Sequence, residues 1–169
     1  MNDHLGILGQ SIYANNLILD VLRRRKMVYI LDEGSEFNAP LERIWKYLQS
    51  DEEHDHKAIK TINREMQGDN VVVITSEVTL PNLPPVRNKI RFTLYPPFGI
   101  TQEYLEGPMT GSKAFQYYIP KGDKTGVTVV GDFVAKGMDD GSIKRTTMQV
   151  LDISFNEDNE NLKKLLVTV

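Results

Sequence analysis

Residues 36–50, with the sequence EFNAPLERIWKYLQS, decide the fold of this chain. Four apolar side chains in this stretch recur at i, i+3, i+4 and i+7, the spacing of one helical face: Leu41, Ile44, Trp45 and Leu48. Pro40 suits the first helical turn, where its missing N–H needs no partner, and leaves Asn38 or Ala39 as the cap. A strand that turns directly into a helix carrying the only tryptophan predicts a folding nucleus.

Composition limits the classes of function. At 169 residues the chain is the size of one domain with a hydrophobic core of its own. A net charge of −3 argues against a general nucleic-acid-binding protein, which needs a basic surface. The absence of cysteine excludes disulfides and thiolate metal ligands, and it fits the reducing cytoplasm, where we expect the protein to be located. No apolar run is long enough to predict a membrane-spanning helix.

The first 26 residues differ from the rest, and we treat residues 1–26 as an extension of a domain that occupies residues 27–169. The apolar stretch from Leu5 to Leu22 is followed by RRRK, whereas a secretory signal places its basic residues before the apolar region. Three interpretations stay open. The extension is a packed or frayed helix, it makes weak contact with a membrane surface, or Met27 is the natural start.

The remaining pattern predicts an α+β domain. We expect a first strand over residues 28–37, the short helix from Pro40 to near Ser50, and a second short helix around residues 53–66, where Ile59, Ile62 and Met66 have helical spacing. Five further strands are expected over residues 71–80, 86–95, 100–105, 113–119 and 127–135. A long helix closes the chain from about Ser142. The total is about six or seven strands.

This order of elements predicts a curved antiparallel sheet around the C-terminal helix, because that helix must bury its apolar face against the sheet. The strand connections are rich in glycine and proline, so the sheet can curl. Side chains rarely fill such a grip completely. We therefore expect a cavity between helix and sheet.

The stretch FNAPLERIWKYLQS resembles the "(I/V)xAPxExVWxxL" opening of the START-like, or SRPBCC, superfamily of polyketide cyclase/dehydrase-like and lipid-transfer domains. The segments LEGPMTGSKAFQYYIP, KGDKTGVTVVGDF and FNEDNENLKKL lie where that superfamily has its strand-rich middle and final helix. The resemblance covers about residues 27–167. It implies a helix-grip fold with a cavity for a hydrophobic ligand, and it does not imply one activity.

The expected lining of the cavity is apolar and aromatic: Leu48, Phe92, Leu94, Tyr104, Tyr117, Phe133, Val150 and Phe155. Tyr117 and Tyr118 alternate between the two faces of their strand, so one of them should point inward. His56 belongs to the acidic stretch DEEHDH. The family resemblance places this stretch near the cavity mouth, where His56 can face the ligand.

Catalytic alternatives rest on few residues. Glu106, Tyr117 and His56 are the candidate acids and bases, although solvated side chains are the simpler interpretation. His54 and His56 are two positions apart and do not share a helical face, so we expect no metal site and no cofactor. The sequence thus predicts binding or transport of a lipid, isoprenoid or polyketide-like molecule. The alternatives are a cyclase or dehydrase in the same cavity, or a membrane-peripheral interaction module.

Overall fold

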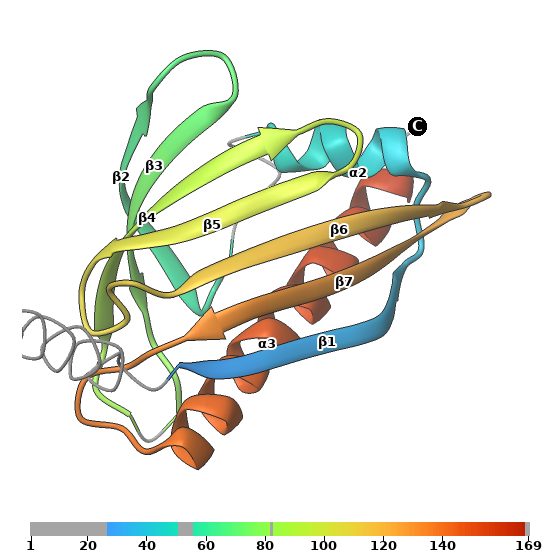
Figure 1. Ribbon diagram of the computed structural model, residues 1–169. Helices are drawn as coiled ribbons and strands as arrows, with labels where there is room; N and C mark the ends of the chain where they lie inside the picture. Colours follow the sequence, from blue (N-terminus) through green and yellow to red (C-terminus); the bar gives the residue numbers. More distant parts are fainter. Residues whose placement is uncertain (1–26, 51–55, 82, 168–169) are drawn as a thin grey trace, which may run out of the picture.

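The fold is described from a computed structural model, which defines residues 27–50, 56–81 and 83–167. In these residues one antiparallel sheet has the strand order β1-β7-β6-β5-β4-β3-β2 (Figure 1). Its strands are β1 Val28–Phe37, β2 Ile59–Met66, β3 Val71–Val78, β4 Val86–Tyr95, β5 Gly99–Glu106, β6 Lys113–Lys121 and β7 Lys124–Phe133. The first and last strands of the chain order, β1 and β7, pair with each other, and every other pair is a hairpin.

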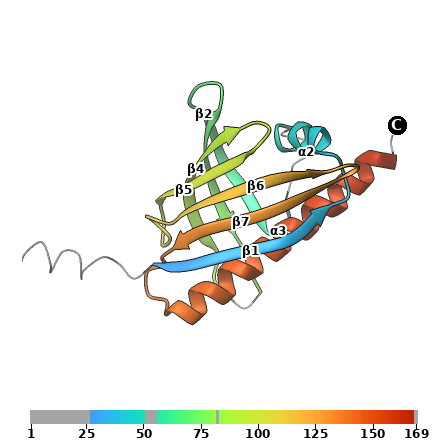
Figure 2. The ribbon, with the colours of Figure 1, turned by 45° about the vertical axis from the view of Figure 1, so that its right-hand side comes forward.

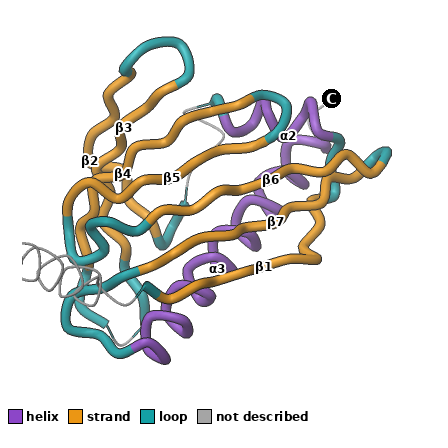
Figure 3. Tube along the Cα trace, in the orientation of Figure 1, coloured by secondary structure: helices purple, strands orange, loops and turns teal. Residues whose placement is uncertain are grey.

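Both described helices lie on the same side of the sheet. The long helix α3, Asp140–Val167, runs along one face, which we call the inner face, and packs mainly against β1 (Figure 2). The short helix α2, Leu41–Leu48, lies across the end of the sheet where β6 and β7 turn (Figure 3). The expected helix-grip α+β fold is therefore confirmed, with seven strands.

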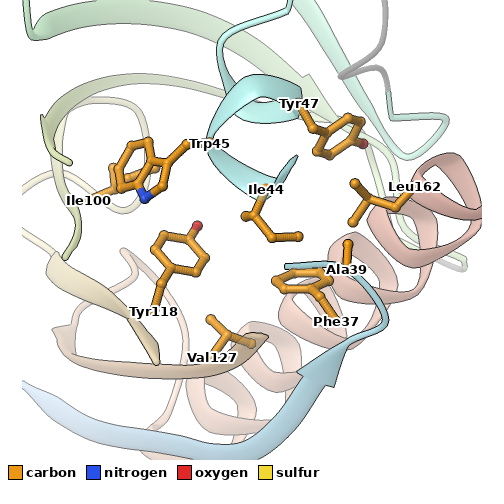
Figure 4. Close-up of a cluster of buried hydrophobic side chains, with 9 residues drawn as sticks. All are labelled: Phe37, Ala39, Ile44, Trp45, Tyr47, Ile100, Tyr118, Val127 and Leu162. Carbon is orange, nitrogen blue, oxygen red and sulfur yellow. The ribbon is translucent and has the colours of Figure 1, made fainter. Parts of the chain in front are cut away.

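Two apolar clusters hold the helices to the inner face. The first joins α2, the end of β1, strands β5 to β7 and α3: Phe37, Ala39, Ile44, Trp45, Tyr47, Ile100, Tyr118, Val127 and Leu162 (Figure 4). The second fixes the beginning of α3 against β1, β6 and β7: Ile30, Ala114, Val129, Phe133 and Ile143. The sheet is thus closed by helices on its β1 side, and this decides where a site can lie.

The opening stretch folds nearly as its sequence indicates. Ile44 and Trp45 are buried on the inner side of α2, and the Trp45 indole Nε1 donates a hydrogen bond to the Pro97 carbonyl at 3.0 Å. The expected cap, Asn38 or Ala39, is wrong by one or two residues, since Pro40 itself is the N-cap, with an extended backbone and no side-chain hydrogen bond. The corner is held instead by the buried Thr125 hydroxyl, which donates to the Ala39 carbonyl at 2.8 Å.

The second short helix is wrong over residues 59–66, which form strand β2; residues 51–55 lie outside the described residues. β2 pairs with β3 and is joined to it by a turn with Gly68 at φ +101°. Ile62 and Met66, whose spacing suggested a helical face, are 42% and 54% exposed. Backbone pairing with β3 outweighs the helical spacing, because the spacing buries nothing here.

Gly99 is required where β5 passes closest to β6. A Cβ at this position would collide with the carbonyl oxygen of Gln116 and lie 2.8 Å from the Phe115 ring. Gly99→Ala is therefore expected to lower the free energy of unfolding by about 1–3 kcal/mol, the usual cost of overpacking. Urea denaturation followed by circular dichroism measures it. Gly122→Ala is a matched control for backbone strain alone, since no atom lies within 4 Å of its Cβ position. Equal stabilities for Gly99→Ala and the native chain would contradict this prediction.

Candidate functional site

The inner face of the sheet forms the floor of the candidate site. Strand register places alternate side chains there: Tyr118 lies opposite Val127, and Ile100 lies opposite Leu94. Phe92 and Leu94 on β4 are only half-buried, although they pack against the first apolar cluster. The floor is thus apolar and partly accessible on its β4 side, away from the strand against which α3 packs.

The helix side of the site is also incompletely buried. Val150 and Phe155 on α3 are half-buried, and the Phe155 ring lies 4.8 Å from the Phe37 ring. Leu48 is half-buried against the first cluster, at the α2 end of the site. We call the expected space between these α3 side chains, Leu48 and β4 the inner groove. Its expected walls therefore come from three separate elements.

Two of the expected lining residues belong to the packed core instead. Phe133 is 2% exposed, within the second apolar cluster. Tyr104 packs against this cluster, with its ring edge-on to Phe133 at 6.5 Å. Burial raises the pKa of the Tyr104 phenol to about 12, so this group stays protonated at neutral pH.

Tyr117 does not point inward, which corrects one expected position. Its side chain is 41% exposed on the opposite face, where it stacks with Phe115, whereas Tyr118 is buried on the inner face. The Tyr118 hydroxyl donates to Gln116 Oε1 at 3.1 Å. Alternation predicted that one of the two tyrosines faces inward, but it could not decide which one.

Glu106 is also on the outer face, although alternation places it on the same side as Tyr104. The register between β4 and β5 shifts between Lys89 and Ile90. Ile90 pairs with Tyr104, whereas Lys89 pairs with Glu106. One extra β5 residue inverts the alternation, as in a β-bulge. The Glu106 side chain is 70% exposed and forms an ion pair with Lys89 at 3.1 Å. This exposed position does not favour the expected catalytic role of Glu106.

His56 contacts two acidic side chains of α3. Its Nδ1 lies 3.2 Å from Glu157 Oε2, and its Nε2 lies 3.5 Å from Asp158 Oδ1. The Tyr47 hydroxyl from α2 donates to the same Asp158 oxygen at 2.7 Å. Asp158 therefore joins α2, α3 and the segment before β2, and we call Tyr47, His56, Glu157 and Asp158 the polar junction.

Asp158 is the most unusual group of the polar junction. Burial raises the pKa of its carboxyl to about 6, although the nearby His56 and the Tyr47 hydrogen bond act in the opposite direction. Burial and the Asp158 charge together raise the pKa of the Tyr118 phenol. A carboxyl that titrates near neutral pH beside a histidine and a tyrosine has the chemistry of an acid–base group.

The sequence contained one signal for this junction. Asp158 lies in line with Thr147, Leu151 and Leu162 on the apolar side of the C-terminal helix, and a carboxylate there needs partners. Its partners Tyr47 and His56 are more than 100 residues away in sequence. No spacing rule connects residues that meet only through packing of α2 and α3.

Two hollows occur on the described surface. One, of about 360 Å³, lies where α2 meets the turns after β4 and β6, with Leu41, Trp45, Pro97 and Pro120 in its wall. The other, of about 410 Å³, lies on the outer face over β5, β6 and β7. Neither hollow lies between α3 and the sheet, so the expected cavity there stays a prediction.

Within residues 27–50, 56–81 and 83–167, no three histidine or acidic side chains are grouped as a metal site requires. The helices among them lack the length and apolar character needed to cross a bilayer. His54 and the extension 1–26 lie outside these segments.

Comparison with known proteins gives structural matches alone. No protein-family model and no curated protein matches the sequence. The Zhui aromatase/cyclase from Streptomyces sp. R1128 superposes with a TM-score of 0.59 at 15% identity, over 80% of this chain and 91% of that one. Ara h 8.0201 has a TM-score of 0.59 at 12% identity, over 82% and 99% of the two chains.

A third similar structure is the di-domain ARO/CYC StfQ from the steffimycin biosynthetic pathway. It has a TM-score of 0.62 at 14% identity, over 97% of this chain and 61% of that chain. Identities this low establish a shared fold and no shared activity. The strand order, the long C-terminal helix and these superpositions together show that the chain has the helix-grip fold of these structures.

Proposed function

We propose that the protein binds a small hydrophobic or amphipathic molecule in the inner groove. The observation that carries this proposal is that apolar side chains of two elements stay half-buried: Phe92 and Leu94 on β4, and Val150 and Phe155 on α3. Apolar groups left partly accessible on an inner surface gain roughly 25 cal/mol per Å² when a ligand covers them. A lipid, isoprenoid or polyketide-like molecule has the required apolar surface.

The polar groups suit an amphipathic ligand. Gln116 and Tyr118 lie on the inner face, and the polar junction lies at the α2 end of α3. Few polar groups among many apolar ones fix the orientation of a ligand without supplying most of its affinity. The aromatase/cyclase names of the structural neighbours are consistent with a ligand of this kind.

Phe92→Glu is expected to weaken binding of an apolar fluorescent probe, N-phenyl-1-naphthylamine, by at least about tenfold, because binding then buries a carboxylate. Val150→Glu changes the opposite wall and is expected to have the same effect. Met138→Glu is the matched control, since Met138 is 38% exposed and lies before α3. Probe titration measures the affinities, and circular dichroism checks the fold.

Equal probe affinity in the native chain and both groove variants would contradict the proposal. Native mass spectrometry of protein purified from its own host adds an independent test, because a bound molecule survives this measurement. A co-purifying apolar molecule that is lost in Phe92→Glu supports the inner groove as its site. A molecule retained equally in that variant places binding elsewhere.

A second candidate function is a cyclase-type reaction in the same groove, and the polar junction favours it. His56 stays a candidate and Asp158 joins it as acid and base, since both side chains are largely buried, whereas the Glu106 and Tyr117 side chains are exposed. A poly-β-ketone thioester incubated with the protein would then lose water, visible as a mass decrease. Asp158→Asn removes the titrating proton and should abolish this loss, while unchanged turnover would exclude Asp158 as the catalyst.

We also propose that the domain begins at residue 27 and that the protein is cytoplasmic. A membrane-peripheral role through the extension 1–26 is tested by deleting these residues. If the extension anchors the protein, the deletion abolishes co-sedimentation with anionic vesicles. Equal co-sedimentation of both forms removes that role.

A further inference from the structure

The outer face of the sheet, opposite α3, is divided into a charged part and an apolar part. Towards one end, side chains of successive strands form cross-strand ion pairs, with Glu103 between Arg91 at 2.9 Å and Lys113 at 2.8 Å. Towards the turn between β4 and β5, the same face exposes Leu31, Tyr95 and Tyr117 by 46%, 46% and 41%. An antiparallel sheet usually presents polar residues to water on its open face, so the apolar part indicates a partner.

Strand register makes this apolar part continuous. Leu31 lies opposite Val130, and Val130 lies opposite Phe115. Tyr117 follows Phe115 two residues later, on the same face of β6. Tyr117 stacks with Phe115, with ring centroids 6.3 Å apart. Beside these residues is the hollow of about 410 Å³, with Phe115 and Val130 in its wall. We call Leu31, Val130, Phe115, Tyr117 and Tyr95 the outer apolar band.

The charges beside the band form an alternating row across four neighbouring strands. Register aligns Asp132 on β7 with Lys113 on β6, Lys113 with Glu103 on β5, and Glu103 with Arg91 on β4. The signs are therefore negative, positive, negative and positive. A row of this kind is complementary to its own reversed copy.

We propose that the outer face is the contact surface of a two-fold symmetric homodimer. A two-fold axis parallel to the strands, between β5 and β6, brings the outer faces of two copies together. The strand order of the second copy then runs in the opposite direction, so β6 faces β5 of the other copy and β7 faces its β4. Lys113 then faces Glu103 of the other copy, and Asp132 faces Arg91. Each contact occurs twice, with opposite signs throughout, and the sheets pack in the aligned manner common for two sheets.

The apolar band fits the same arrangement. Tyr117 of β6 lies opposite Gly99 of β5 within one sheet, so the axis places Tyr117 over Gly99 of the other copy, where no side chain stands. The Phe115 ring of that other copy covers its own Gly99, with a ring atom 2.8 Å from the position that a Gly99 Cβ would take. Tyr117 therefore meets this ring. Four aromatic rings thus gather at the axis, and their burial supplies most of the affinity.

The charge balance favours a second copy over a membrane. The row beside the band has two positive and two negative side chains and no net charge. An anionic bilayer attracts surfaces with an excess of lysine and arginine. The dimer proposal does not depend on the inner groove, which lies on the other face of the sheet.

Sedimentation velocity over a wide range of protein concentrations tests the proposal. The full-length protein should form dimers, and Tyr117→Lys should weaken dimerisation by at least about tenfold, because each copy then loses an aromatic ring at the axis and brings an unpaired lysine there. Ile62→Lys is the matched control, because Ile62 is 42% exposed on β2 and lies outside the band. A native chain that stays monomeric overturns the proposal, and so does a dimer that Tyr117→Lys leaves intact.

Charge exchange gives a sharper test. Lys113→Glu brings two glutamates together across the axis, and Glu103→Lys brings two lysines together, so each variant alone should dimerise poorly. A mixture of the two variants restores opposite charges in every cross-axis contact and should recover the dimer. Mixing cannot repair damage within one chain. Absence of recovery on mixing therefore overturns the arrangement.

Discussion

Trp45→Ala is expected to lower the free energy of unfolding by about 3–5 kcal/mol, the largest effect we predict for a single core position. Trp45 is 7% exposed, and its ring lies edge-on to Tyr118 with centroids 5.7 Å apart (Figure 4). Its indole also holds α2 to the turn after β4 through Pro97. The substitution removes both contacts and leaves a cavity between α2 and the sheet.

Urea denaturation followed by far-UV circular dichroism measures this loss, since the variant has no tryptophan fluorescence. Trp45→Phe separates the two contributions. It keeps an aromatic ring against Tyr118 but loses the hydrogen bond, so we expect about 1–2 kcal/mol. Met138→Ala, at a position 38% exposed, should change stability by less than about 0.5 kcal/mol. A Trp45→Ala cost as small as this control would show that α2 contributes little to the fold.

Asp158→Asn is expected to stabilise the protein at neutral pH, by up to about 3 kcal/mol, because the folded pKa of about 6 lies above the ordinary value of 3.8. The folded state holds the Asp158 proton more tightly than the unfolded state does. The stabilisation from this proton is complete below about pH 4 and is lost as the pH rises to about 6. Asparagine has no proton to lose, and its Oδ1 can still accept the Tyr47 hydrogen bond.

Denaturation of both proteins across pH 4 to 7 measures the difference in their free energies of unfolding. This difference should grow between about pH 4 and pH 6 and stay constant above that range. Burial also raises the pKa of Asp32. This carboxyl is present in both proteins, so its titration cancels in the difference. A difference that does not vary with pH would show that Asp158 titrates alike in both states.

Much of the fold could be predicted because its signals are local. β4 was expected over residues 86–95 and begins and ends there, since alternation is regular and prolines flank it. The α2 face was recognised from helical spacing alone, and Ile44 and Trp45 are buried as expected. Such patterns succeed where one face of an element is buried and the other is not.

β2 shows where local signals fail. Its sequence IKTINREM has good helix formers and helical spacing, but all its residues after Ile59 are exposed. An exposed segment has no burial pattern to reveal its period. Its conformation follows from the open edge of β3, whose backbone groups it pairs.

The candidate site was predictable in kind and less so in its residues. Phe92 and Leu94 could be placed on one face by alternation, and the structure puts both on the inner face. Alternation failed at Glu106, because the register shift after Ile90 has no marker in the sequence. Asp158 was recognisable as a polar residue in an apolar stripe, but its partners were not.

The sequence by itself determined the strands other than β2, the two described helices and the apolar character of the site, because each depends on neighbours within a few turns or residues. The tertiary structure alone decided that Tyr118 rather than Tyr117 faces inward, that β2 extends the sheet, and that Tyr47 and His56 meet Asp158. These outcomes depend on register and on contacts between distant segments. Their energies come from burial and pairing that exist only after α2 and α3 have packed on the sheet.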